Sequence, residues 1–227
     1  MRSRGVTVLI LWLLGSMMPA SGDDGYRLWL KYDQISDRAY LKECSKTLNS
    51  VMVTGDSPML RAAHEELLTG LGGMTGRRIN DVQNLTCGGI VVAGTFESSP
   101  LIATLLPDIK PGATGEEGFL IRSVTQKGKR IIVIASDGEN GVLYGVFHLL
   151  RLVSMGSPLK DLTVTEKPAV ALRLLNHWDN LDRSVERGYA GSSIWNWHLL
   201  PDYISPLYKD YARANASIGI NGTVLTN

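Results

Sequence analysis

The 227-residue sequence is poor in cysteine and has no concentrated positive charge, and each shortage excludes a class of protein. Its only cysteines are Cys44 and Cys87, and no group of neighbouring Cys and His residues resembles a zinc site. Lys and Arg number 23 against 22 Asp and Glu, without a basic run. A nucleic-acid partner requires a basic patch, so the sequence predicts no nucleic-acid binding. No metal or organic cofactor is implied either.

The two cysteines leave two alternatives open. In an oxidising compartment, Cys44 and Cys87 can form a disulfide. Otherwise they are two buried free thiols, which is common for cysteine in protein cores.

The longest apolar run is too short for a membrane span. Residues 6–18 read VTVLILWLLGSMM and follow the basic start MRSRG, whereas a spanning helix needs about 20 apolar residues. A basic start, a short apolar run and small residues at Ala20 and Gly22 are typical of a signal peptide. We therefore expect cleavage after residues 1–22, a secreted or periplasmic protein, and no membrane contact afterwards. An N-terminal anchor is the alternative.

Residues 23–165 alternate between strand and helix patterns. Expected strands are 26–32, 51–53, 89–95, 119–125 and 130–135, and expected helices are 57–71, 98–106 and 141–155, with a short helix or loop at 37–48. The turn QKGK joins two of these strands into a hairpin. This order predicts an N-terminal α/β sandwich, a mixed sheet with helices on one face. No grouping of acid, base and nucleophile stands out in it.

A second domain is expected over residues 166–227, because Pro168 restrains the chain before a new strand at 170–175. A long loop, 176–201, leads to a helix that begins near 202 or at a Ser205 cap, and a strand follows at 218–225. One βαβ unit cannot bury both faces of its strands. A TIM (β/α)8 barrel needs about 250 residues, so we expect the incomplete start of such a barrel in a longer protein.

Strand ends are the place to look for a site, since barrel enzymes hold their functional residues there. The motif His-Trp-Asp-Asn, which includes Trp178, follows the first expected barrel strand, and Asn227 follows the second. An indole packs against the C–H face of a sugar, and neighbouring amides and carboxylates satisfy its hydroxyls. The pattern predicts a carbohydrate site. For Trp195 and Trp197, packing is an equal alternative.

Three stretches carry a resemblance to a known family: LRLLNHWDNLD, ERGYAGSSIW and INGTVLTN. They resemble the opening of the barrel in α-glucuronidases of glycoside hydrolase family 67. DGYRLWLKY, SPMLRAAHEELLTGLGGMTG and GVLYGVFHLLR are similar in kind and order to the N-terminal domain of that family. The resemblance covers nearly all of residues 23–227.

The resemblance implies an enzyme that removes glucuronic acid, or its 4-O-methyl ether, from glucuronoxylan-derived oligosaccharides. It cleaves the α-1,2 link with inversion, which requires two carboxyl groups about 6.5–9.5 Å apart. In the family these acids lie on later strands, so we expect no catalytic residue in this chain. A homodimer of the longer protein is also in keeping with the family.

The resemblance assigns a pocket wall rather than a catalytic centre. It places Trp178 in the uronic acid subsite and Asn227 at its rim. Asp179, Asn180 and Arg187 are expected to orient Trp178 or the substrate, with loop-fixing hydrogen bonds as the alternative. Two other functions stay open: a non-catalytic glycan-binding or dimerisation module, and another barrel glycosidase with a similar accessory domain. The HWDN and ERGYAG stretches disfavour the latter.

Overall fold

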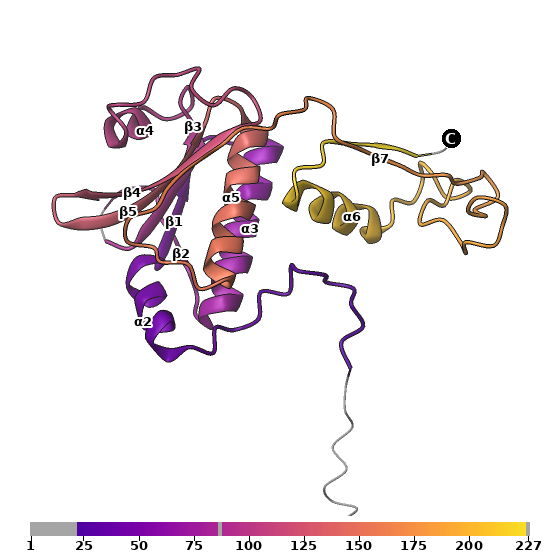
Figure 1. Cartoon of the computed structure of the whole chain (residues 1–227), viewed down its shortest axis with the longest axis horizontal. Coiled ribbons are helices and arrows are strands. Elements are labelled where there is room, and N and C mark those ends of the chain that lie inside the picture. The colour runs from indigo at the N-terminus through magenta and orange to yellow at the C-terminus, as the bar shows by residue number, and fades with distance from the viewer. Residues whose placement is uncertain (1–21, 86–87, 226–227) are drawn as a thin grey trace, which may run out of the picture.

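The computed structural model describes residues 22–85 and 88–225. A six-stranded sheet with its helices forms one unit, and a smaller β–α–β unit protrudes from it (Figure 1). The expected α/β class and the mixed sheet are confirmed. The expected signal peptide falls, except for Gly22, outside the described residues, as do Cys87 and Asn227. In the described part of the chain, no helix is long and apolar enough to span a bilayer.

The sheet has the order β2-β1-β3-β5-β4-β6. Its parallel strands are β1 (Ser50–Val53), β2 (Asn80–Asp81), β3 (Ile90–Thr95) and β5 (Lys129–Ser136). Strand β4 (Phe119–Gln126) runs antiparallel to β5 and to β6 (Thr163–Glu166). The β4–β5 hairpin is confirmed, and its two turn residues, Lys127 and Gly128, both have positive φ, as a tight hairpin turn requires. Sequence patterns missed β2 and β6, which are short and mostly exposed.

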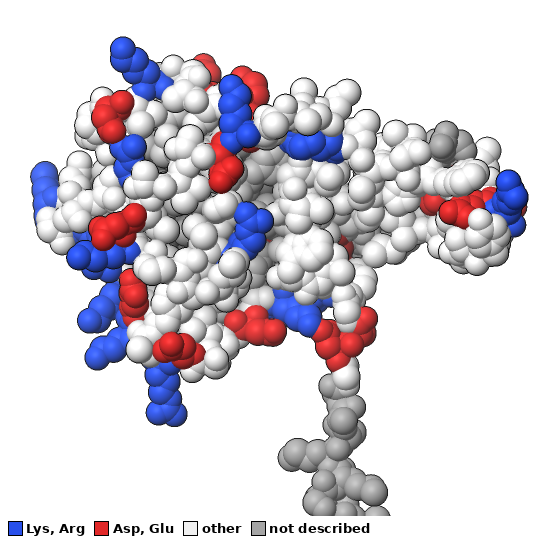
Figure 2. Space-filling view, in the orientation of Figure 1, with Lys and Arg blue, Asp and Glu red and all other residues white. Residues whose placement is uncertain are grey.

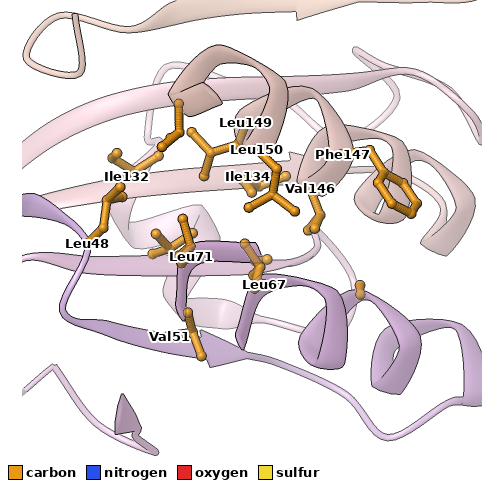
Figure 3. Close-up of a cluster of buried hydrophobic side chains, with 14 of the residues drawn as sticks. Leu48, Val51, Leu67, Leu71, Ile132, Ile134, Val146, Phe147, Leu149 and Leu150 are labelled. Carbon is orange, nitrogen blue, oxygen red and sulfur yellow. The ribbon is translucent and has the colours of Figure 1, made fainter. Parts of the chain in front are cut away.

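Three helices cover one face of the sheet: α2 (Arg38–Thr47), α3 (Pro58–Thr75) and α5 (Glu139–Ser154). In Figure 3, side chains from α3, α5 and the sheet meet in one cluster that includes Leu67, Leu71, Val146, Leu149, Leu150, Ile132 and Ile134. Each fully buried side chain of this size contributes about 1.5–3 kcal/mol through burial. The close approach of α5 depends on Gly145, where a Cβ would lie 2.6 Å from the Ile134 side chain.

The expectation of helices on one face only was wrong. Helix α4 (Pro100–Leu105) covers the opposite face, where Ile102 and Leu105 are buried. They pack with the strand residues that alternate with those of the first cluster: Ile90, Val92, Ile131 and Val133. Because successive strand side chains point to opposite faces, a strand such as β3, buried along its whole length, requires cover on both.

Residues 26–32 do not form the expected strand. They form turns and irregular backbone, with positive φ at Leu28 and Tyr32. Their aromatic rings reach the helix of the second unit: the Tyr26 hydroxyl donates to Asp210 (2.7 Å), and Trp29 Nε1 donates to Ser217 (2.8 Å). The aromatic enrichment therefore reflects contact between the two units and not strand pairing.

The second unit consists of β7 (Leu174–Asn176), α6 (Pro206–Ser217) and β8 (Gly222–Val224), and β7 pairs in parallel with β8. The expected β–α–β order and the Ser205 cap are confirmed, since the Ser205 side chain accepts from Leu207 N. Both strands are shorter than expected because Arg173 uses the backbone before β7: its guanidinium donates to the Val170 and Ala171 carbonyls.

A buried ion pair joins α6 to α3. Arg213 donates to both carboxylate oxygens of Glu66, at 2.6 Å and 2.8 Å, and the Glu66 side chain is only 7% exposed. The Tyr32 hydroxyl donates to the same carboxylate, and the Arg213 guanidinium lies 5.7 Å from the centre of the Tyr32 ring. Bidentate geometry is what allows such a pair to offset the cost of removing both charges from water.

A second polar cluster holds the base of β7. Glu117 accepts from Arg173 Nη2 (2.9 Å) and from Asn221 Nδ2 (3.0 Å), while Arg173 Nε donates to the Gly219 carbonyl (2.6 Å). Partial burial raises the pKa of Glu117, but the hydrogen bonds from Asn221 and Arg173 outweigh it and hold the pKa below its ordinary value. The loop before β4 is thereby tied to the starts of both β7 and β8, which lie at the same end of the pair.

The Arg213→Met substitution should destabilise the chain by about 3 kcal/mol, because it leaves Glu66 buried without its cation. Lys209→Met is the matched control, since Lys209 pairs with Glu65 between the same two helices, at 3.9 Å and exposed to solvent. Chemical denaturation of both variants measures the difference. Equal losses would show that the Glu66 pair contributes no more than a surface contact.

Glu117→Gln should lower the free energy of unfolding by about 1 kcal/mol at pH 7. This is the value of a hydrogen bond to a charged group, reduced because Glu117 is partly exposed to solvent. Because the folded pKa of Glu117 is lowered, its stabilisation is present above the unfolded pKa of about 4.3 and is lost as pH falls through the folded value. Melting curves from pH 7 to pH 3 should therefore converge with those of the unmodified chain. A constant gap would contradict this, and Glu97→Gln, at an exposed turn, is the control.

Candidate functional site

The strand ends of the second unit define the candidate site. Asn176 pairs with Val224, and the ladder continues where His177 N donates to the Val224 carbonyl (2.9 Å). Since β7 and β8 are parallel, the residues after Asn176 and those after Val224 lie at the same edge. The position of Asn227 itself is outside the described residues.

Residues 177–179 alternate between two faces. His177 and Asp179 face α6, and the Asp179 side chain is almost fully buried, with Oδ2 3.6 Å from His177 Nδ1. Trp178 lies between them and is 52% exposed. Extended backbone sends neighbouring side chains to opposite sides, so the Trp178 ring stands on the face away from α6. The structure places Trp178, and not Asp179, at the open surface.

The loop that follows is closed by its own hydrogen bonds. Asn180 Nδ2 donates to the Ser184 hydroxyl (2.9 Å) and to the Glu186 carbonyl (2.8 Å), and Glu186 N donates to the Trp178 carbonyl (2.7 Å). Arg183 and Glu186 adopt positive φ to make these turns. Asn180 thus makes the loop-fixing hydrogen bonds that were expected as the alternative to orienting Trp178 or the substrate. The Arg187 side chain is exposed at the outer part of the loop.

An aromatic cluster packs between the strand end and α6, and the sequence patterns did not predict it. Trp195 is buried, with its ring centre 4.7 Å from that of Tyr208 and 5.6 Å from that of Tyr211. His177 joins through an edge contact to Trp195 and a 2.5 Å contact between its Nε2 and the Tyr211 hydroxyl. The spacing of Tyr208 and Tyr211, three residues apart on α6, was the one sequence feature that could have indicated this cluster. Trp195 is a packing residue, whereas Trp178 is not.

Neither Asp182 nor Asp179 is suited to act as a general acid beside Trp178. The hydroxyl and backbone N–H of Ser184 both donate to Asp182 and lower its pKa, whereas a general acid needs a raised one. Asp179 is buried against His177 on the face away from Trp178. Over the described residues, no group of three or more His, Cys, Asp or Glu side chains is placed to hold a metal ion. The arrangement can bind a ring on Trp178.

Figure 2 shows that the visible face of the second unit is mostly uncharged up to its far end. Its exposed apolar side chains include Val170, Leu172, Leu174, Leu175, Trp178, Leu181, Tyr189, Leu199, Tyr203 and Ile204. A separate groove of about 1180 Å³ lies between residues 26–32, α3, α5 and α6, and Trp178 does not line it. The candidate site is therefore an open surface at the strand ends and not this groove.

The Cys44 side chain is fully buried. Burial raises the pKa of this thiol. Cys87 is outside the described residues, so a disulfide between the two stays an untested prediction.

Curated relatives of this chain are α-glucuronidases. A probable alpha-glucuronidase A from Aspergillus oryzae is 32% identical over 239 residues, covering 100% of this chain and 26% of the relative. The alpha-glucuronidase A of Emericella nidulans is 29% identical, with 97% and 26% covered. The chain thus spans about a quarter of the length of these relatives.

Solved structures agree at the level of the fold. A GH115 4-O-methyl-alpha-glucuronidase with specificity for decorated arabinogalactans superposes with a TM-score of 0.55 at 16% identity, covering 78% of this chain and 25% of that chain. At this identity the likeness concerns the fold alone.

Two family models together match most of the chain. The glycosyl hydrolase family 67 N-terminus matches residues 28–149, and the glycosyl hydrolase family 67 middle domain matches residues 152–227. The first range holds most of the sandwich, and the second holds β6, β7, α6, β8 and the Trp178 loop. The chain belongs to glycosyl hydrolase family 67.

Proposed function

We propose that this chain is part of an α-glucuronidase that hydrolyses the α-1,2 link between (4-O-methyl)glucuronic acid and xylo-oligosaccharides, with inversion, in xylan breakdown. The observation that carries the proposal is Trp178, half exposed at the carboxyl end of β7 beside the end of a parallel β8. An exposed indole at such a place suits a sugar ring. Glucuronoxylan-derived oligosaccharides are the proposed partners, and export through residues 1–22 is part of the proposal.

The second unit is proposed as the opening of a (β/α)8 barrel. In the described residues, β7 and β8 pair only with each other, and Leu174 and Leu175 of β7 are exposed. Open edges and exposed leucines need further strands, and a closed barrel supplies them on both sides. The two catalytic carboxyl groups are proposed to come from those further strands, since Asp179 is buried against His177 and Asp182 has a lowered pKa.

The pocket wall is proposed to consist of Trp178 and Asn227. Asp179, Asn180 and Arg187 are proposed as orienting groups. The buried contact of Asp179 with His177, and the bonds of Asn180 within the loop, support an indirect action through Trp178. Arg187, exposed on the outer loop, has room to approach a charged substrate.

The proposal is tested by release of glucuronic acid from aldotetraouronic acid, with the 227-residue chain and a version extended to the natural stop codon assayed in parallel. Activity only in the extended protein, in culture medium or periplasm, is expected. Activity in neither protein would favour the glycan-binding or dimerisation module, which binding of the same oligosaccharide then tests. Activity in the short chain would mean that its own carboxylates catalyse the reaction.

Trp178→Ala in the extended protein should reduce kcat/KM on aldouronic acids by about a hundredfold, the loss expected for a central aromatic contact. The fold should persist, because the ring is half exposed. Met155→Ala is the control: Met155 is 73% exposed and lies at the end of α5, in the sandwich. Near-normal turnover by a folded Trp178→Ala protein would remove Trp178 from the pocket.

A further inference from the structure

We propose that Tyr211 and His177 form a positioning pair that sets the orientation of the Trp178 indole. The inference rests on the proposed function, because it takes Trp178 as the wall of the sugar subsite. It assigns a role to two residues that would not themselves touch substrate.

The pair connects α6 to the end of β7. His177 Nε2 lies 2.5 Å from the Tyr211 hydroxyl, and the two rings meet edge to face with centres 5.3 Å apart. Trp195 closes one side of His177, with ring centres 5.8 Å apart. Packing and a short hydrogen bond together hold the imidazole in one orientation.

The neighbouring carboxylate determines where the imidazole carries its proton. Asp179 Oδ2 lies 3.6 Å from His177 Nδ1, and an ionised carboxylate can only accept. The proton of a neutral imidazole therefore belongs on Nδ1, facing Asp179, and Nε2 accepts from the Tyr211 hydroxyl. The three groups follow one another in the order carboxylate, imidazole and phenol.

The backbone transmits this orientation to Trp178. His177 N donates to the Val224 carbonyl, and the Trp178 carbonyl accepts from Glu186 N, so the backbone is fixed just before His177 and just after Trp178. A shift of the imidazole must therefore turn the indole on the opposite face. At 52% exposure, Trp178 has less packing of its own to fix its orientation than a buried tryptophan.

Tyr211→Phe is the test, because it removes only the hydroxyl and keeps the ring contacts with Trp195 and His177. In the extended enzyme we expect KM for aldouronic acid to rise roughly three- to tenfold, which corresponds to the loss of one hydrogen bond. We expect little change in kcat. A loss of folded protein alone would lower the apparent kcat and leave KM unchanged. The control is Tyr40→Phe, which removes a hydroxyl bonded to the Ser157 carbonyl within the sandwich and should leave both constants unchanged.

Nuclear magnetic resonance of histidine-labelled 227-residue chain tests the pair without activity. The chain has four histidines, and His177 is assigned by the signal lost in His177→Gln. A protonated Nδ1 and an unprotonated Nε2 are expected, with a change at Nε2 in Tyr211→Phe but not in Tyr40→Phe. The opposite tautomer, or no response to Tyr211→Phe, would overturn the proposal.

The two proposals fail in different ways. If the unmodified extended enzyme releases no glucuronic acid, the proposed function fails, and the nitrogen signals still decide whether the pair exists. If that enzyme is active and Tyr211→Phe leaves KM unchanged, the positioning role is wrong and the function stands.

Discussion

The arrangement of the two units depends on the buried pair between Glu66 and Arg213. Glu66 lies on α3, inside the sandwich, where an unpaired carboxylate would be costly. Its partner is supplied by α6, the single helix of the second unit within the described residues. The charge on α3 is thus accommodated only when α6 is docked at one position and rotation. Tyr32, which donates to the same carboxylate, adds residues 26–32 to the joint.

Helix α6 can serve both units because its two sides carry different chemistry. Asp210, Arg213 and Ser217, spaced by three and four residues, contact Tyr26, Glu66 and Trp29 on the sandwich side. Tyr208 and Tyr211 lie on the other side. Tyr208 packs against Trp195, and Tyr211 packs against both Trp195 and His177. A helix whose rotation is set by ionic contacts on one side presents its tyrosines in a fixed place on the other. The sandwich therefore influences, through α6, the position of the strand end that carries Trp178.

Local patterns predicted the parts of the fold that local physics determines. Ser57 and Pro58 begin α3, the turn at Lys127 and Gly128 closes the hairpin, and Ser205 caps α6, each through contacts within a few residues. These features lay within reach of the sequence. So did the place of Trp178 after a strand.

Long-range contacts decided what the sequence could not show. Residues 26–32 have the composition of a strand, but they do not join the sheet, and Tyr26 and Trp29 contact α6 instead. The cover of the second sheet face by α4 depends on where a six-residue helix packs. The cluster of His177, Trp195 and Tyr211 combines a strand end, a loop and a helix, so spacing along the chain does not reveal it.

The weak interior of the second unit explains why it needs the sandwich. None of the α6 residues is buried, and β7 and β8 are three residues each. Leu174 and Leu175 of β7 are exposed. Such a unit buries too little apolar surface to offset its own conformational entropy. The contacts of Arg213 and Arg173 with the sandwich supply part of the difference. Because N-terminal domains form first during synthesis, the sandwich is in place to hold the β–α–β unit when that unit is made.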